Sequence, residues 1–114
     1  MKEFLMLIRE SAAYGNLSVE DMQVDIQEHI NWVEELVANG HFLEGNPLES
    51  TGVTLKLNVI SDGPYIETKE CVSCYYKLLA NSLAEATELV KSCPDLKNGA
   101  TLELREIIDT DEQQ

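Results

Sequence analysis

His29 is the side chain in this sequence best placed for proton transfer. It lies one helical turn from Ile26 and Val33, beside an apolar stripe. An imidazole titrates near neutral pH, which suits general acid–base catalysis. A catalytic histidine also needs a carboxylate that fixes its tautomer, and Asp62 or Glu67 could supply it. The alternative is a histidine that only packs in a core or an interface, and the residue types leave both open.

Charged side chains crowd a short stretch that contains Asp62, Glu67, Lys69 and Glu70. In a regular strand, Glu67 and Lys69 point to the same side. One interpretation is therefore a polar rim at the mouth of a ligand cavity, to which both residues contribute. The other is an exposed hairpin, whose ion pairs contribute little to stability.

Three more side chains are candidates for binding a ligand. Arg9 ends the first expected strand and is a natural anion-binding group, although it would equally well neutralise a nearby carboxylate. Tyr75 and Tyr76 are adjacent in an expected strand, so they point to opposite faces. We expect one of them in the core and the other in a cavity, where its hydroxyl could orient a ligand.

The sequence offers no motif for a metal or a cofactor. Cys71 and Cys74 form a CxxC, but no second pair of cysteines or histidines completes a zinc site. In a strand these two residues would also point to opposite faces. Phosphate-binding loops, dinucleotide fingerprints and hydrolase motifs are absent as well. We therefore expect no metal and no cofactor.

The composition excludes some classes of partner. Acidic residues outnumber basic residues by 21 to 8, which gives a formal net charge of −13. This charge repels nucleic-acid phosphates and anionic lipids, so we expect neither nucleic acid nor membrane as a partner. The opening apolar run at 4–8 is too short to span a bilayer, and we expect a cytoplasmic protein. The length fits one domain, over residues 1–108, with an acidic tail at 109–114.

Apolar spacing predicts the elements that must position these residues. Strands are expected at 2–9, 53–59, 72–80 and 102–108, with a short one at 65–67. Helices are expected from Ser18 to Gly40 and from Ser82 to Pro94. Residues 41–52 are expected to form a loop, because Gly45, Pro47 and Gly52 punctuate them. The order β-α-β-β-β-α-β indicates an α+β, ferredoxin-like subunit with an antiparallel sheet.

Two apolar surfaces are expected to be covered. The first helix carries an apolar stripe that should pack on the sheet: Val19, Met22, Ile26, Ile30, Val33, Leu36 and Val37. In the first strand, Phe4, Met6 and Ile8 face one way, whereas Leu5 and Leu7 face the other. Two helices cover only one face of a four-stranded sheet, and exposure of the other costs about 25 cal/mol per Å². We therefore predict a homodimer that pairs sheet to sheet around a small-molecule cavity.

The string DGPYIETKE at 62–70, followed by Tyr75 and Tyr76, resembles the DGPF motif of the YCII-related, or DGPF-domain, proteins. The opening KEFLMLIRE and the segment around Ser82 agree, so the resemblance spans nearly the whole chain. It implies a dimeric α+β barrel of ferredoxin-like subunits. It also implies a histidine on the first helix that shares an active site with an aspartate. His29 matches that histidine, and Asp62, which heads the motif, is the candidate aspartate.

The resemblance leaves the activity open. It implies a family with a few enzymes that act on small ring substrates, some accessory domains of sigma-factor-type regulators, and many members without an assigned activity. Tyr65 replaces the usual Phe, and Ser73 and Cys74 replace small glycines. The first hypothesis is a non-catalytic homodimer that binds a small molecule in the cavity between its sheets. The alternative is a cofactor-independent lyase or isomerase that uses His29, with Asp62 as its partner.

Overall fold

A computed structural model describes residues 1–11, 19–49, 51–62 and 70–110, and at 11, 59, 61, 62 and 70 it describes the backbone only. The strands are β1 (Lys2–Ser11), β2 (Phe42–Pro47), β3 (Val53–Lys56), β4 (Val59–Asp62), β5 (Glu70–Ala80) and β6 (Thr101–Glu106). The helices are α1 (Val19–Ala38), α2 (Leu83–Val90) and the short 3₁₀ helix η1 (Pro94–Asn98).

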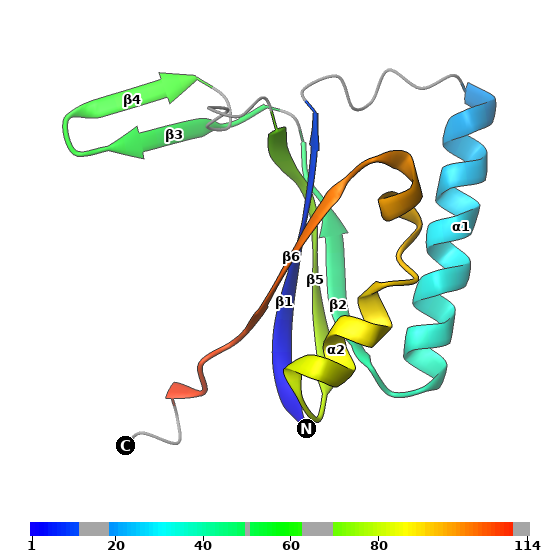
Figure 1. Ribbon diagram of the computed structural model, residues 1–114. Helices are drawn as coiled ribbons and strands as arrows, with labels where there is room; N and C mark the ends of the chain where they lie inside the picture. The colour runs from blue at the N-terminus through cyan, green and yellow to red at the C-terminus, as the bar shows by residue number, and fades with distance from the viewer. Residues whose placement is uncertain (12–18, 50, 63–69, 111–114) are drawn as a thin grey trace.

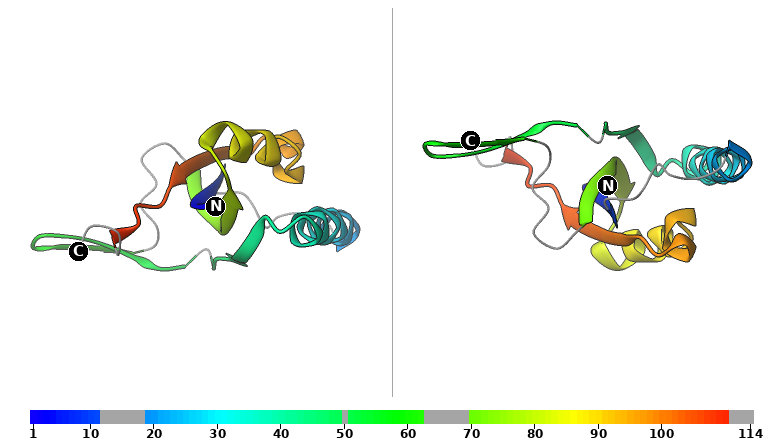
Figure 2. Two further views of the ribbon diagram at one scale, coloured as in Figure 1. Left: turned by 90° about the horizontal axis from the view of Figure 1, so that it is seen from below. Right: turned by 90° about the horizontal axis from the view of Figure 1, so that it is seen from above.

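Four strands form one antiparallel sheet in the order β2-β5-β1-β6. Both α-helices lie on the same face of this sheet, as the two perpendicular views agree (Figures 1 and 2). This order and layering are those of a ferredoxin-like subunit, so the predicted α+β class is confirmed. The hairpin β3–β4 forms a separate two-stranded sheet and projects on the side opposite the helices (Figure 1).

The second strand of the sheet was wrongly predicted as loop. Residues 42–47 pair with β5, whereas the expected strand at 53–59 falls in the hairpin. Gly45 is needed within β2 because a Cβ there would overlap the Tyr76 ring. Pro47 is tolerated because it ends an edge strand. The expected short strand at 65–67 lies outside the described residues.

The core lies between the sheet and the helices. Phe4, Met6 and Ile8 are at most 1% exposed, whereas Leu5 and Leu7 are partly exposed on the other face. The predicted alternation along the first strand is therefore confirmed. The larger of two core clusters contains Met6 and Ile8 with Trp32, Leu36, Tyr76, Leu78, Val90 and Cys93, and Phe4 belongs to the smaller cluster.

The apolar stripe of α1 packs over only part of its length. Trp32 and Leu36 are buried in the C-terminal half of the helix. Met22 and Ile26 in the N-terminal half, and Ile30 just past the midpoint, remain 42–54% exposed. The helix was correctly predicted, but the burial of its whole stripe was wrong, since Leu36 is the one stripe residue that is buried. The exposed Met22, Ile26 and Ile30 border the cavity described below.

Local hydrogen bonds set the helix boundaries. Gly40 has φ +76° and ends α1, and the N–H of His41 donates to the carbonyl of Leu36 (2.8 Å). At the start of α2, the hydroxyl of Ser82 accepts from the N–H of Glu85 (3.1 Å), as the sequence predicts. None of the helices in the described residues is long and apolar enough to cross a bilayer.

Candidate functional site

His29 on α1 is joined to Asp95 on η1. The Nε2 atom of His29 lies 2.7 Å from Oδ2 of Asp95. The Nδ1 atom lies 2.8 Å from the backbone carbonyl of Asp25, one turn earlier on α1. A carbonyl can only accept a hydrogen bond, so Nδ1 carries a proton and donates it. This fixes the orientation of the ring and directs Nε2 at the buried carboxylate of Asp95.

The electrostatics of this pair favour a charged histidine. The hydrogen bond to Asp95 raises the pKa of His29 to about 9, although burial opposes the shift. The hydrogen bond to the Asp25 carbonyl adds to the increase. At neutral pH the ring is therefore an imidazolium that donates from both nitrogens. The Nε2 proton is the one a general acid at this position would deliver.

Asp95 also accepts from a thiol. The Sγ atom of Cys93 lies 3.7 Å from Oδ2 of Asp95. Burial raises the pKa of Cys93 to about 12, so this group stays a neutral thiol and is a poor nucleophile at neutral pH. Its contribution here is packing in the core and a weak hydrogen bond.

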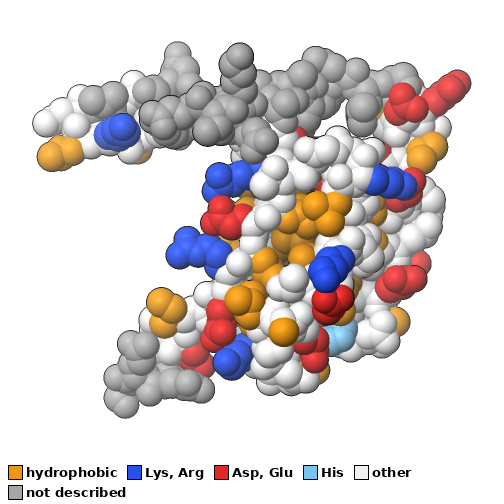
Figure 3. Space-filling model, viewed as in Figure 1, with side chains coloured by type: hydrophobic (Ala, Val, Ile, Leu, Met, Phe, Trp, Pro, Cys, Tyr) orange, Lys and Arg blue, Asp and Glu red, His pale blue; other side chains and the backbone are white. Residues whose placement is uncertain are grey.

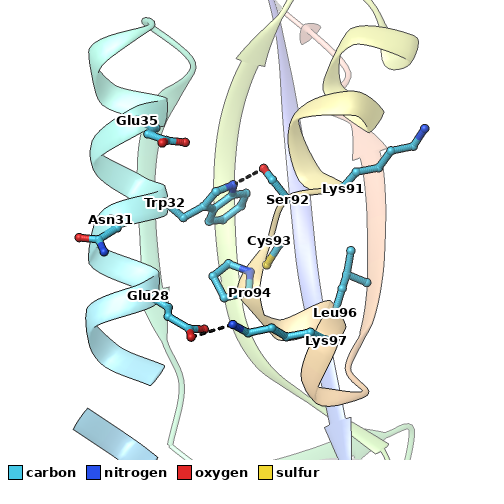
Figure 4. A pocket seen from close by; sticks show the side chains of 10 residues that line it. All are labelled: Glu28, Asn31, Trp32, Glu35, Lys91, Ser92, Cys93, Pro94, Leu96 and Lys97. Carbon is cyan, nitrogen blue, oxygen red and sulfur yellow. Dashed lines mark hydrogen bonds and ion pairs between the residues drawn. The ribbon is translucent and has the colours of Figure 1, made fainter. Parts of the chain in front are cut away.

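Three further contacts tie α1 to the segment around η1. Lys97 donates to Glu28 (2.7 Å), and the indole N–H of Trp32 donates to the hydroxyl of Ser92 (2.8 Å; Figure 4). Asn98 donates to the carboxylate of Asp25 (3.4 Å). A shallow pocket of about 670 Å³ lies along this seam. These contacts hold η1 against the middle of α1, and so hold Asp95 against His29.

A larger cavity, of about 980 Å³, lies on the other side of the pair. It is bounded by the N-terminal half of α1, η1, and the ends of β1, β2 and β5. His29, Asp95 and Tyr76 are all in its wall. Its apolar lining includes Met22, Ile26, Ile30, Leu48 and Ala100. A volume of this size and a mixed apolar and polar wall are typical of a small-molecule site.

The predicted site residues fall on two faces of the sheet. Tyr76 is 7% exposed and lies on the helix face with His29. Tyr75 lies on the open face, where its hydroxyl accepts from Asn46 (3.0 Å). Arg9 is on the open face too, and its guanidinium forms an ion pair with Glu103. The sheet therefore separates Arg9 and Tyr75 from the cavity.

The other predicted site residues are only partly described. Asp62 ends β4, and its side chain is outside the described atoms. Glu67 and Lys69 lie outside the described residues altogether. The carboxylate in contact with His29 is that of Asp95. The predicted roles of Asp62, Glu67 and Lys69 stay predictions.

Comparison with known proteins assigns the chain to a family. A family model described as the YCII-related domain matches residues 3–111. The chain belongs to the YCII-related domain family. A search of curated proteins finds no match. The family assignment confirms the resemblance seen in the sequence. In this YCII-related domain, His29 lies on the first helix, α1.

Sequence reasoning missed Asp95 in this YCII-related domain. The residue is 66 positions from His29, and no local spacing connects the two. The order of the elements is the one feature of the sequence that could have indicated this contact. In a ferredoxin-like subunit both helices lie on one face, so a residue that directly follows the second helix can approach the first.

The same residues of the YCII-related domain could hold a cation. Asp25, His29 and Asp95 each offer a ligand atom, and these atoms lie within 4.8 Å of one another. One imidazole and two carboxylates suit several divalent cations. However, both ring nitrogens of His29 already face acceptors, so a cation would have to replace the Nε2 proton. The geometry fits a hydrogen-bonded ion pair better, and the prediction of no metal stands as a prediction.

Proposed function

We propose that this YCII-related protein binds a small molecule in the cavity beside His29 and Asp95, and that it does so as a homodimer. The observation that carries the proposal is a cavity of about 980 Å³ with a partly buried ion pair in its wall. The half-exposed side chains of Ile26 and Ile30 support it, because a ligand would remove their apolar surface from water.

The proposed ligand site differs in place from the predicted one. The sequence predicts a cavity between the sheets of two subunits, lined by Arg9 and by one of Tyr75 and Tyr76. The proposed site lies instead within one subunit, between α1 and the sheet. The inter-sheet cavity stays a prediction about the dimer, and Arg9 and Tyr75 would belong to the dimer interface.

The open face of the sheet supports the proposed dimer. Leu5 and Leu7 are apolar side chains at its centre, next to Tyr75. The ion pairs Arg9–Glu103 and Lys77–Glu44 lie on the same face, and basic and acidic side chains gather below the projecting hairpin in Figure 3. An apolar centre with charged neighbours is the usual anatomy of a protein interface. A second copy offers the same surface and so can complete it by twofold symmetry.

A thermal-shift screen with matched histidine variants tests ligand binding. A panel of small polar and aromatic metabolites is screened against wild type, His29→Gln and His41→Gln. We expect hits that raise the Tm of wild type and His41→Gln alike, and that raise the Tm of His29→Gln less, because a ligand that binds more tightly stabilises the folded state more. The absence of hits with wild type, or equal shifts in all three proteins, would contradict the proposal.

The second candidate function is a cofactor-independent lyase or isomerase. It is favoured by the 2.7 Å contact that holds Nε2 of His29 in its protonated form beside the cavity. A substrate oxygen or carbon that replaces Asp95 as acceptor could take this proton. Each hit is incubated with the protein, and its NMR spectrum is followed for product signals. Turnover that falls by about 100-fold or more in His29→Gln would favour the enzyme, and unchanged spectra with wild type would leave binding as the function.

A further inference from the structure

We infer that the cavity beside His29 selects a ligand with a cationic amine and an apolar body. The inference rests on the proposed function, because it assigns a chemical class to the ligand of the same cavity. It excludes anionic ligands such as carboxylates and phosphates. The observations that carry it are the charges and the apolar surface that line the cavity.

Negative charge predominates in the described part of the lining. Five carboxylates contribute to it, against the two cationic groups of His29 and Lys97: Glu10, Asp21, Asp25, Glu28 and Asp95. With His29 protonated, these groups have a net charge of −3. The excess negative charge would repel an anion that enters the cavity, whereas a cation would be attracted and would partly neutralise it.

Both cationic groups are already paired. His29 lies 2.7 Å from the carboxylate of Asp95, and Lys97 lies 2.7 Å from that of Glu28. An anionic ligand could bind either group only after it displaced a protein carboxylate. Among the described cavity-lining residues, no basic group is therefore available to an incoming anion.

Two carboxylates remain for an incoming cation. Glu10, near the end of β1, lines the cavity, and it forms no ion pair with any described residue. Asp25 accepts a long hydrogen bond from Asn98 (3.4 Å) and forms a longer ion pair with His29, whose Nδ1 lies 3.6 Å from its Oδ1. The neighbouring Asp95 and Glu28 help to raise the pKa of Asp25, after burial as the first cause. An ammonium group beside Asp25 would offset this repulsion and gain a charge-assisted hydrogen bond.

The apolar part of the cavity wall would bind the apolar body of the ligand. Met22, Ile26 and Ile30 line the cavity from α1 and are 42–54% exposed. Leu48 and Ala100 line it from the sheet side. A fully hydrated metal ion would leave this surface in water, whereas an alkyl or aromatic amine would cover it. The matching class of ligand is therefore a small amphipathic amine.

Three probes that share one apolar group and differ in charge test which charge the cavity prefers. These are 2-phenylethylamine, 2-phenylethanol and 3-phenylpropanoate, titrated into isotope-labelled full-length protein and followed by backbone NMR at neutral pH and low salt. We expect the amine to bind about tenfold or more tightly than the alcohol, and the carboxylate to bind most weakly. The shifted signals should map to α1 and η1. Added salt should reduce the preference for the amine.

Isosteric variants identify the carboxylates responsible. Asp25→Asn and Glu10→Gln should each reduce the preference for the amine over the alcohol by about threefold or more. Glu34→Gln removes the same charge from an exposed position on the opposite side of α1, and it should leave the preference unchanged. Equal effects of all three variants would overturn the inference, because general attraction to an acidic protein would then explain the preference.

The possible failures can be told apart. If the alcohol or the carboxylate binds in the cavity as tightly as the amine, the inference is wrong and the proposed cavity site stands. If none of the three probes perturbs the cavity residues at millimolar concentration, both the inference and the proposed site are contradicted. If the amine shifts signals only on the open face of the sheet, the inference is wrong and the ligand site belongs elsewhere.

Discussion

Nε2 of His29 and Oδ2 of Asp95 lie 2.7 Å apart, although 66 positions separate the two residues in the sequence. This contact joins the middle of α1 to η1 at the wall of the larger cavity. It therefore links the stability of the helix–sheet arrangement to the protonation of a residue that faces the proposed ligand. Two of the predictions below follow from this relationship.

The ionisation of His29 should be displaced to high pH. Its pKa is expected at about 9, since the hydrogen bond to Asp95 stabilises the imidazolium. In Asp95→Asn the charged partner is lost while burial remains, so the pKa should fall back toward its ordinary value. NMR titration of the imidazole protons measures both values, and His41→Gln assigns the signals. A wild-type pKa close to 6.5 would show that the pair is not formed in solution.

The same pair should make stability depend on pH. The pKa of His29 is higher in the folded state than in the unfolded state, so folding favours the protonated form. Its stabilisation is fully present below the unfolded pKa of about 6.5 and is lost as the pH rises through about 9. At about pH 6, His29→Gln should lower the free energy of unfolding by about 2 kcal/mol. Urea unfolding at about pH 6 and about pH 10 checks this, and a difference that grows with pH would have the wrong sign.

Gly45 should be required for the packing of Tyr76. In Gly45→Ala the new Cβ would overlap the tyrosine ring, which is itself buried against Trp32. We expect a loss of about 1–3 kcal/mol in the free energy of unfolding, as in other overpacked cores. Gly52→Ala is the matched control, because no atom of the described residues lies within 4 Å of a Cβ there. Equal denaturant midpoints for the two variants would show that the ring has room to move.

The proposed dimer should depend on the open face of the sheet. Leu5→Asp places a charge at the centre of that face and should weaken self-association by about 100-fold or more. Leu83→Asp is the control, since Leu83 is 53% exposed in the first turn of α2, where a negative charge is favourable. Sedimentation velocity over a concentration series measures both. A wild type that stays monomeric throughout, or a Leu5→Asp protein that stays dimeric, would contradict the proposed interface.

Local patterns in the sequence were enough for much of the fold. The alternation of Phe4, Met6 and Ile8 with Leu5 and Leu7 is a property of one strand, and the structure confirms it. The strand at 42–47 could not be recognised, because glycine and proline are usually turn residues. Gly45 is required because it packs against Tyr76, which is distant in the sequence. Local sequence patterns cannot predict such a contact.

Only one of the two residues in the His29–Asp95 pair could be predicted from the sequence. His29 could be nominated from its residue type and its place on a helix. Asp95 could not, because only the packing of η1 on α1 brings it to the ring. Helical periodicity likewise predicted that Ile26 and Ile30 share one face, but not that α1 leaves this face beside a cavity.

The most direct test of the central claim is to fill the cavity. Ile26 lines it, so Ile26→Trp should occupy the volume that a ligand would take. Val37→Trp makes a similar change on the same helix, at a residue that is 57% exposed and outside the cavity lining. The dissociation constant of the tightest small-molecule hit is measured by calorimetry for wild type and both variants. The account predicts that binding is lost in Ile26→Trp and retained in Val37→Trp; unchanged affinity in Ile26→Trp would contradict it.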